Sequence, residues 1–135
     1  MDECIFCKII NNEIPCNIVY ETDIVQAFMD IAPINKGHVL VIPKKHYETL
    51  LDIPEGILSD FIVETKKVAA AVKKATNADG FNLMMNNYKD AGQIVPHAHI
   101  HIVPRFKDDG LKLWPGGKYE EGEIKEFSKK IKNLL

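Results

Sequence analysis

The chain is 135 residues long, which suits one domain with one core, and its 17 Lys and Arg against 19 Asp and Glu leave a net charge of −2. This balance excludes a general attraction to nucleic acid or to an anionic membrane, so we expect neither partner, and any phosphate must be held by local groups. The apolar runs are too short to cross a bilayer and the N-terminus does not resemble a signal peptide, so we expect a single domain, 1–135, in the cytoplasm.

The first half of the chain predicts three strands. Short runs of apolar and β-branched residues predict strands over 17–21 and 24–30, joined by a tight turn into a hairpin. A third strand within 37–44 is apolar on both faces and ends at Pro43. We therefore expect this strand near the centre of its sheet.

One long helix is predicted over 52–77. Asp52 is its expected N-cap, with Pro54 in the first turn and Glu55 as the capping-box partner. The apolar spacing predicts a buried stripe that consists of Ile57, Leu58, Phe61, Ile62, Thr65, Val68, Ala69 and Val72.

The second half adds two strands, over 81–87 and 96–105, and a short C-terminal helix within 119–135. We expect this helix to dock on the domain through an apolar stripe of Ile124, Phe127 and Ile131. Strands joined by short turns, with one long helix inserted, indicate an α+β domain with a mainly antiparallel, five-stranded sheet.

The segment "PHAHIHIVPR" places three histidines at alternate positions: His97, His99 and His101. On a strand they share one face, while the apolar residues between them face the core. Three interpretations remain: a three-histidine metal centre, a histidine nucleophile with helpers, and a solvated polar face. The metal centre fits poorly, because the outer two side chains stand roughly 13 Å apart along an extended strand.

Two further features carry chemistry. Gly92 and Gln93 lie in a polar loop just before the histidines, where backbone N–H groups and an amide can approach an oxyanion. Cys4 and Cys7 form a C-x-x-C pair, which suits two zinc ligands, a redox pair or two buried thiols. Three cysteines in all are too few for a disulfide framework, which agrees with a reducing compartment.

Four ordered segments resemble the histidine triad (HIT) superfamily of nucleotide hydrolases and transferases. They are "CIFCKII", "FMDIAPINKGHVLVIPKKH", "GFNLMMNN" and "GQIVPHAHIHIVPR", and they run through nearly the whole chain. The resemblance is stronger to the Hint-type nucleoside phosphoramidases and their prokaryotic relatives than to the Fhit-type dinucleoside polyphosphate hydrolases. It implies a HIT-like fold and a homodimer, in which the segment 114–119 resembles a loop near the partner's active site.

The resemblance also implies covalent catalysis at the histidine strand. His99 matches the family's nucleophile, and His101 would donate a hydrogen bond to a phosphate oxygen. Gln93 and Asn86 would face the phosphate, and Asp30 falls where the family holds the ribose hydroxyls. The implied base pocket is apolar and consists of Phe6, Ile9, Ile14 and Ile31.

A structural zinc is implied in the same way. Some prokaryotic family members, and the related galactose-1-phosphate uridylyltransferases, resemble an arrangement in which His46 and His97 would complete a Zn²⁺ site with Cys4 and Cys7. Such a closed site supports the fold and does not activate water. His38, at the start of the third strand, is either a polar end residue or a support for the active site, and we favour the structural interpretation.

The expected function is therefore a hydrolase that cleaves purine nucleoside phosphoramidates or related nucleotide phosphoesters. The alternatives are a nucleotide-binding or interaction protein with vestigial catalysis, a dinucleoside polyphosphate hydrolase, and a metallohydrolase. One residue departs from the family pattern: Ile94 stands where Ser or Thr usually supplies a hydroxyl near the leaving group. We expect weak activity on poor leaving groups, unless Ile94 only packs against the core and a neighbour supplies the donor.

Overall fold

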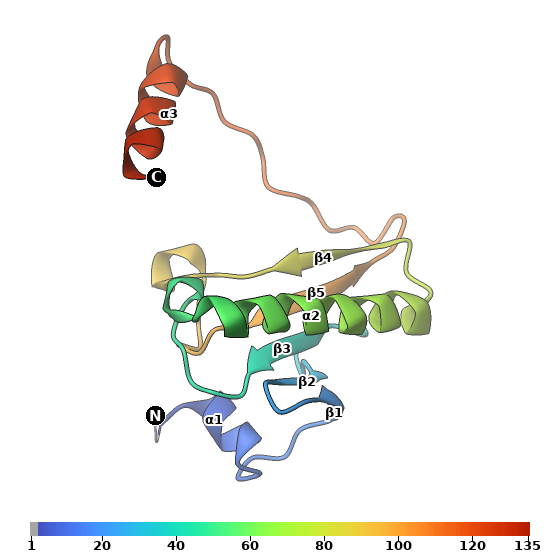
Figure 1. The fold of residues 1–135 in the computed structure, drawn as a ribbon. Coiled ribbons are helices and arrows are strands. Elements are labelled where there is room, and N and C mark those ends of the chain that lie inside the picture. Colours follow the sequence, from blue (N-terminus) through green and yellow to red (C-terminus); the bar gives the residue numbers. More distant parts are fainter. Residues whose placement is uncertain (1–2) are drawn as a thin grey trace.

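A five-stranded sheet forms the centre of the molecule, and the computed structural model describes residues 3–135 (Figure 1). In chain order the strands are β1 (Ile18–Glu21), β2 (Val25–Met29), β3 (Val39–Pro43), β4 (Gly80–Met84) and β5 (Ile100–Arg105). Their order across the sheet is β1-β2-β3-β5-β4, and every neighbouring pair is antiparallel. The predicted α+β class is confirmed.

Three α-helices lie within the described residues: α1 (Ile5–Ile10), α2 (Glu55–Thr76) and α3 (Glu123–Leu134). Short 3₁₀ turns cover Leu50–Asp52 and Lys89–Ala91. The helix α1 is not among the elements predicted above. It begins after Cys4, whose thiol accepts a hydrogen bond from the backbone N–H of Cys7. This single turn therefore starts within the C-x-x-C pair.

The predicted N-cap of the long helix is wrong. Asp52 belongs to the preceding 3₁₀ turn, where its Oδ2 accepts from the backbone N–H and the hydroxyl of Thr49, both at 2.9 Å. The helix α2 begins at Glu55, after Pro54, which has no side chain to cap it. The predicted capping box between Asp52 and Glu55 is therefore wrong: Asp52 is the partner residue of a capping box whose N-cap is Thr49.

Apolar side chains cover both faces of the sheet, as the two-sided burial of β3 predicts. On one face, the buried stripe of α2 packs against alternate residues of β2, β3 and β5. On the other, Phe6 and Ile9 of α1 pack with residues of β2 and β3. Ile62 was predicted in the α2 stripe but is 47% exposed, because its side chain lies at the margin of the contact.

The histidine strand is shorter than predicted. Strand β5 begins at Ile100, so His97 and His99 lie in the extended segment that leads into it. Here the backbone bonds to a loop and not to the sheet: the N–H of Ala98 donates to the carbonyl oxygen of Tyr47 at 2.7 Å. The apolar residues Ala98, Ile100 and Ile102 pack in the core against α2, as predicted.

The C-terminal helix α3 forms as predicted, but its docking on the domain does not. Figure 1 shows α3 standing clear of the sheet at the end of an extended segment. Ile124, Phe127 and Ile131, expected to be buried, are 62%, 48% and 58% exposed. Within residues 3–135, Tyr119 packs against Phe127 at 6.3 Å between ring centroids, and the stripe is otherwise exposed.

Candidate functional site

His99 is a buried histidine whose free nitrogen is fixed by its neighbours. Its Nδ1 lies 2.7 Å from the backbone carbonyl oxygen of His97, and a carbonyl oxygen can only accept. Nδ1 therefore carries the proton, and the lone pair of the neutral ring is on Nε2. Burial lowers the pKa of His99, opposed by the bond to His97, and Phe6 stands edge-on at 5.1 Å between ring centroids. The ring is thus held as a neutral imidazole with Nε2 available.

His101 is oriented by His38. The backbone N–H of Ile34 donates to Nδ1 of His38 at 3.1 Å, so that nitrogen must be the acceptor and Nε2 carries the proton. Nε2 of His38 lies 2.9 Å from Nδ1 of His101 and donates to it. His101 consequently carries its own proton on Nε2. The chain of bonds turns His101 into a neutral hydrogen-bond donor.

Both rings of this pair are held neutral at physiological pH. Burial, with nearby His99 and His38, lowers the pKa of His101 to about 4. Burial also lowers the pKa of His38, against the opposing charge of Asp30. The rings of His99 and His101 are 4.9 Å apart between centroids, so the acceptor nitrogen and the donor lie beside each other.

Gly37 explains why His38 reaches this position. Gly37 has a φ of 100°, a conformation that glycine adopts without strain, and a Cβ there would collide with Thr76 at the end of α2. The chain can therefore turn sharply into β3 and bury His38. The sequence favours a structural role for His38, and the signal for the other interpretation, a support for the active site, is its place directly after a glycine at a strand entrance.

Asp30 lies beside the same pair. Its Oδ2 is 3.6 Å from Nε2 of His38, and its Oδ1 accepts from the N–H of Ala32 at 2.8 Å. Asp30, His38 and His101 are close enough to be considered as metal ligands. Their hydrogen bonds argue against it, because Ile34 occupies Nδ1 of His38 and leaves a proton, not a lone pair, on Nε2. We interpret this group as a hydrogen-bonded relay.

The second cluster consists of the four predicted zinc ligands. The ligand atoms of Cys4, Cys7, His46 and His97 all lie within 4.8 Å of one another. Three sulfur–nitrogen distances are 3.4, 3.4 and 3.6 Å. A tetrahedral zinc with its usual bond lengths separates a sulfur from a nitrogen ligand by about 3.6 Å. The side chains therefore fit a closed Cys₂His₂ site.

The protonation of His97 suits the same role. Its Nε2 donates to the carbonyl oxygen of Pro43 at 2.8 Å, so the lone pair on Nδ1 faces the two thiols. Burial lowers the pKa of His97 to about 4, and in the protein without metal burial raises the pKa of Cys7 to about 11. A cation that binds thiolates is the natural counterpart for two buried sulfurs.

Gln93 and Asn86 belong to the loop before the histidines, and their side chains bond to backbone groups and not to the histidines. Both ends of the Gln93 side chain bond to backbone: Oε1 accepts from Tyr88 at 2.8 Å, and Nε2 donates to Glu48 at 2.6 Å and Val95 at 3.2 Å. Asn86 donates to the carbonyl oxygen of Gly92 at 3.4 Å. These bonds shape the loop that leads into the histidines, beside a hollow of about 530 Å³.

Three of the four predicted base-pocket residues lie in one cluster, and Ile31 does not. Phe6 and Ile9 are buried in the cluster under α1, with Ile14 partly buried at its edge. Ile31 is 94% exposed and lies outside that cluster. Ile94 is 92% exposed, so the interpretation that it only packs against the core is wrong.

Comparison with known proteins agrees with this arrangement. The HIT-domain family profile matches residues 11–108. The chain is 48% identical over 129 residues to an uncharacterized HIT-like protein of Methanocaldococcus jannaschii, covering 96% of this chain and 98% of that one. It is 41% identical over 134 residues to the adenosine 5'-monophosphoramidase hnt1 of Schizosaccharomyces pombe, covering 98% of each.

A further relative and a solved structure extend the comparison. Adenylylsulfatase HINT3 of Arabidopsis thaliana is 43% identical over 110 residues, which are 82% of this chain and 56% of that protein. The crystal structure of SMU.412c from Streptococcus mutans has a TM-score of 0.93 at 38% identity and covers 99% of this chain and 86% of that one.

Proposed function

Because the chain belongs to the HIT family, we propose that it is a nucleotide hydrolase that acts through a covalent intermediate on His99. The proposed substrates are purine nucleoside phosphoramidates or related nucleotide phosphoesters, cleaved at the α-phosphate. Two relatives named for such activities, the monophosphoramidase and the adenylylsulfatase, support this substrate class.

The proposed reaction has two steps. Nε2 of His99 attacks the α-phosphorus and forms a P–N bond, while the bond to the leaving group breaks and the departing amine or oxyanion takes up a proton from solvent. Water then attacks the nucleotidyl-imidazole, gives up a proton to solvent, releases the nucleoside monophosphate and restores the neutral ring. His101 donates its Nε2 proton in a hydrogen bond to a non-bridging phosphate oxygen in both steps.

The observation that carries this proposal is the pair of fixed tautomers. The carbonyl of His97 leaves His99 with its lone pair on Nε2, and His38 leaves His101 with its proton on Nε2. A phosphate beside these two rings meets a nucleophile and a donor that need no proton rearrangement before reaction.

The proposal also assigns the residues that bind the ribose, the phosphate and the base of the nucleotide. Asp30 binds the ribose hydroxyls through Oδ2, since Oδ1 is engaged by Ala32. Gln93 and Asn86 approach the phosphate on the loop side, Gln93 after exchanging one of its backbone bonds. The base lies over the apolar residues near α1, namely Phe6, Ile9 and Ile14, and Ile31 at the rim.

We also propose that Cys4, Cys7, His46 and His97 hold a structural Zn²⁺. The four side chains come from α1, the segment after β3 and the segment before β5, so a bound zinc would tie these elements together. The ring of His97 would serve the metal while its carbonyl orients His99. The proposed zinc ligand His97 is thereby two residues before the proposed nucleophile.

A homodimer is the proposed assembly. Strand β4 is at an edge of the sheet, and its Phe81 and Leu83 are 39% and 44% exposed. Glu64 of α2 bonds to Tyr20 of β1, so this flank of the helix faces the β1 edge of the sheet. Ile62 lies on the opposite flank of the helix and therefore faces the β4 edge. An unpaired edge with exposed apolar residues beside it suits a second copy.

No helix within residues 3–135 is long and apolar enough to span a membrane.

The test is to trap the intermediate. The protein is mixed with an adenosine phosphoramidate, quenched in milliseconds to seconds, and digested for mass analysis. We expect a nucleotidyl adduct on the peptide that contains His99, and none in His99→Ala. His99→Ala should lose hydrolysis while nucleotide binding changes by less than about tenfold, because a nucleophile acts mainly in the transition state.

The outcomes separate the alternatives. Full turnover by His99→Ala ends the covalent mechanism. Nucleotide binding by the wild-type protein without turnover or adduct supports a binding protein with vestigial catalysis. Turnover that is lost on zinc removal from a protein that remains folded supports a metallohydrolase.

A further inference from the structure

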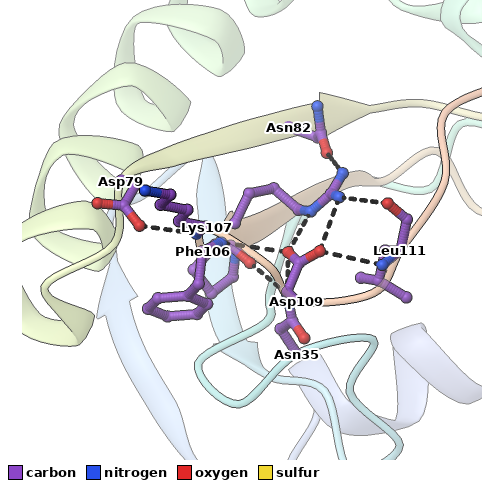
Figure 2. A network of polar contacts seen from close by, with 9 residues as sticks. Asn35, Asp79, Asn82, Phe106, Lys107, Asp109 and Leu111 are labelled. Atoms are coloured by element: carbon purple, nitrogen blue, oxygen red, sulfur yellow. Dashed lines mark hydrogen bonds and ion pairs between the residues drawn. The ribbon is translucent and has the colours of Figure 1, made fainter.

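Some residues other than glycine have a positive φ within residues 3–135, and most of them are explained by their surroundings. They are Asn12, Asn77, Tyr88 and Asp108. Asn12 and Asn77 follow the helices α1 and α2, where asparagine is a common end residue. Asp108 lies in the turn after β5 that the Asp109 carboxylate organises, accepting from the Arg105 side chain at 2.7 and 3.1 Å (Figure 2). Only the tyrosine lacks a local explanation of this kind.

Tyr88 is held in a backbone conformation that favours glycine. Its φ of 72° and ψ of 157° fall in a region that residues with a side chain rarely occupy, because the Cβ crowds the backbone. Its N–H donates to Oε1 of Gln93 at 2.8 Å, and its carbonyl oxygen accepts from the N–H groups of Ala91 and Gln93, both at 3.1 Å. A glycine would make the same bonds without strain, so the loop by itself does not require a tyrosine.

The Tyr88 ring lines the hollow of about 530 Å³ beside this loop. Tyr88 is 60% exposed, Ile94 on the same hollow is 92% exposed, and Pro96 lies beside them in the lining. These side chains present apolar area that a ligand can cover. Two charged residues of the lining, Glu48 and Lys89, have opposite charges that cancel. The hollow therefore suits a flat, uncharged group.

The hollow adjoins the proposed nucleophile. Strands β4 and β5 pair Met84 with His101, and Asn86 and His99 stand two residues beyond that pair on the same two segments. Residues at one level of such antiparallel segments are about 5 Å apart, so Asn86 is a neighbour of His99. Nδ2 of Asn86 donates to the carbonyl oxygen of Gly92 at 3.4 Å, and Gly92 lines the hollow. A single side chain thus connects the two.

Gln93 connects the hollow to the phosphate in the proposed reaction. Its Nε2 would approach the phosphate, while its Oε1 keeps the bond from Tyr88. The nucleophile His99 stands on the side of Phe6 and α1, with 5.1 Å between the ring centroids of His99 and Phe6. The substituent that leaves the phosphorus is in line with the attacking atom and on the opposite side. It would therefore point away from α1, towards the loop that carries Tyr88.

We infer that the hollow is the subsite for the leaving group, and that Tyr88 and Ile94 select leaving groups with a flat, uncharged face, such as the ring of an aromatic amine. This assignment rests on the proposed hydrolase and specifies the part of its substrate beyond the nucleotide. A leaving nucleotide is disfavoured, because its phosphates bring several negative charges to a hollow whose own charges cancel.

The test compares two adenosine 5'-phosphoramidates whose amines have similar basicity. One carries benzylamine, which has a flat ring, and the other carries 2-methoxyethylamine, which has none. Their affinities are measured by titration calorimetry on His99→Ala, where the proposed reaction does not consume them. Their kcat/KM values are measured on the protein with His99, together with that of diadenosine tetraphosphate, whose leaving group is a nucleotide.

Four variants at two positions are combined with both backgrounds. Tyr88→Ala removes the ring, Tyr88→Phe keeps it, and Tyr88→Gly removes both the ring and the strain. Leu51→Ala is the matched control, because Leu51 is an apolar residue that is 78% exposed and does not line the hollow.

We expect the benzyl compound to bind about tenfold or more tightly than the methoxyethyl compound, as burial of its ring against an aromatic side chain implies. Tyr88→Ala and Tyr88→Gly should reduce this ratio to about threefold or less, while Tyr88→Phe and Leu51→Ala should keep it. The ratio of the kcat/KM values should follow the same pattern, and diadenosine tetraphosphate should be a poorer substrate than the benzyl compound.

Thermal melts separate selection from a structural role of the ring. Tyr88→Gly should melt no lower than the wild type, because relief of strain opposes the added freedom of the unfolded chain. A ring that only supports the loop would give a lower melting temperature in Tyr88→Gly and in Tyr88→Ala, with the binding ratio intact.

Equal affinity for the two phosphoramidates, no measurable binding of either, or a ratio that Tyr88→Ala leaves intact overturns the subsite. Faster turnover of diadenosine tetraphosphate than of the benzyl compound overturns the selection against a leaving nucleotide. Failure of the hydrolase has a different signature: no turnover and no His99 adduct. The calorimetric ratio needs no turnover, so a ratio that depends on Tyr88 supports the subsite even then.

Discussion

At the scale of single residues, the site is defined by which nitrogen of each histidine is already engaged. His97 donates from Nε2 to Pro43, His99 donates from Nδ1 to His97, and His38 accepts at Nδ1 from Ile34. Each bond to a backbone group leaves one possible tautomer, and the tautomer fixes the chemistry. Under the proposed function, His97, His99 and His101 would therefore take three different roles: metal ligand, nucleophile and hydrogen-bond donor.

The relay predicts that His38 is a positioning residue for His101. His38→Leu removes the N–H that donates to His101, so kcat should fall about tenfold to a hundredfold with little change in KM. His38→Gln keeps an amide N–H near the same place and should recover part of the loss. Steady-state kinetics on one phosphoramidate, with circular dichroism to check the fold, measures both variants.

A structural role alone would give a different pattern. If His38 only fills space at the start of β3, both variants should lose thermal stability and change kcat in proportion to the folded fraction. Equal kcat for the Leu and Gln variants would contradict the relay.

At the scale of elements, the four clustered side chains belong to segments that lie outside the sheet. They are Cys4, Cys7, His46 and His97. The helix α1 is a single turn outside the sheet, and the segments that carry His46 and His97 are irregular. Short elements of this kind contribute little stability by themselves. Coordination of one metal ion by all three would hold α1 over the sheet face that carries Phe28, Leu40 and Ile42.

The purified protein should contain about one zinc per chain, and Cys7→Ala should lower both the zinc content and the melting temperature. The energy of binding a structural metal is also folding energy, so the unfolding free energy should fall by several kcal/mol. Cys16→Ala is the matched control, because Cys16 is a partly buried thiol outside the cluster. Metal analysis and thermal melts, with and without a chelator, give the comparison.

If protein prepared without chelator holds no zinc, or if Cys16→Ala has the same effect as Cys7→Ala, the metal site is refuted.

At the scale of the whole molecule, the sheet separates two surfaces with different tasks. One face packs against α2 and supplies most of the core, and the other carries α1, the histidines and the cysteines. The functional groups therefore sit on a rigid support while loops approach from the edges. As a consequence, several histidines are buried in the neutral form.

Lowering the pH should destabilise the folded protein over a pH range that is set by the pKa values of the buried histidines. The pKa of His101 is lowered to about 4 in the folded protein, and in an unfolded chain it is about 6.5. Between these values the unfolded chain binds more protons, so the unfolding free energy should fall as the pH drops from about 6.5 towards 4. Above about pH 6.5 this contribution should be constant.

The variant His38→Gln/His101→Gln isolates the contribution of these two histidines, because the wild type and the variant have the same carboxylates and the same proposed zinc ligands. Denaturant melts from pH 4 to 8 should give a smaller slope against pH for the variant in that window. Asp109, whose pKa is lowered, contributes stability that is lost only at lower pH, below the usual range of a carboxyl group. Equal slopes for both proteins would remove His38 and His101 as the cause.

The sequence by itself determined the fold class, the central strand and the apolar face of the histidine segment, because strand periodicity and two-sided hydrophobicity are local properties. It also placed the four cysteine and histidine side chains that the structure brings together, through spacing and family resemblance. The tertiary structure alone decided what depends on contacts between distant segments. His38 could not be assigned until Ile34 and His101 were placed beside it, and the capping role of Asp52 depended on where Thr49 lies. The stripe of α3 is visible in the sequence, but periodicity shows only that a face is apolar and not which surface covers it.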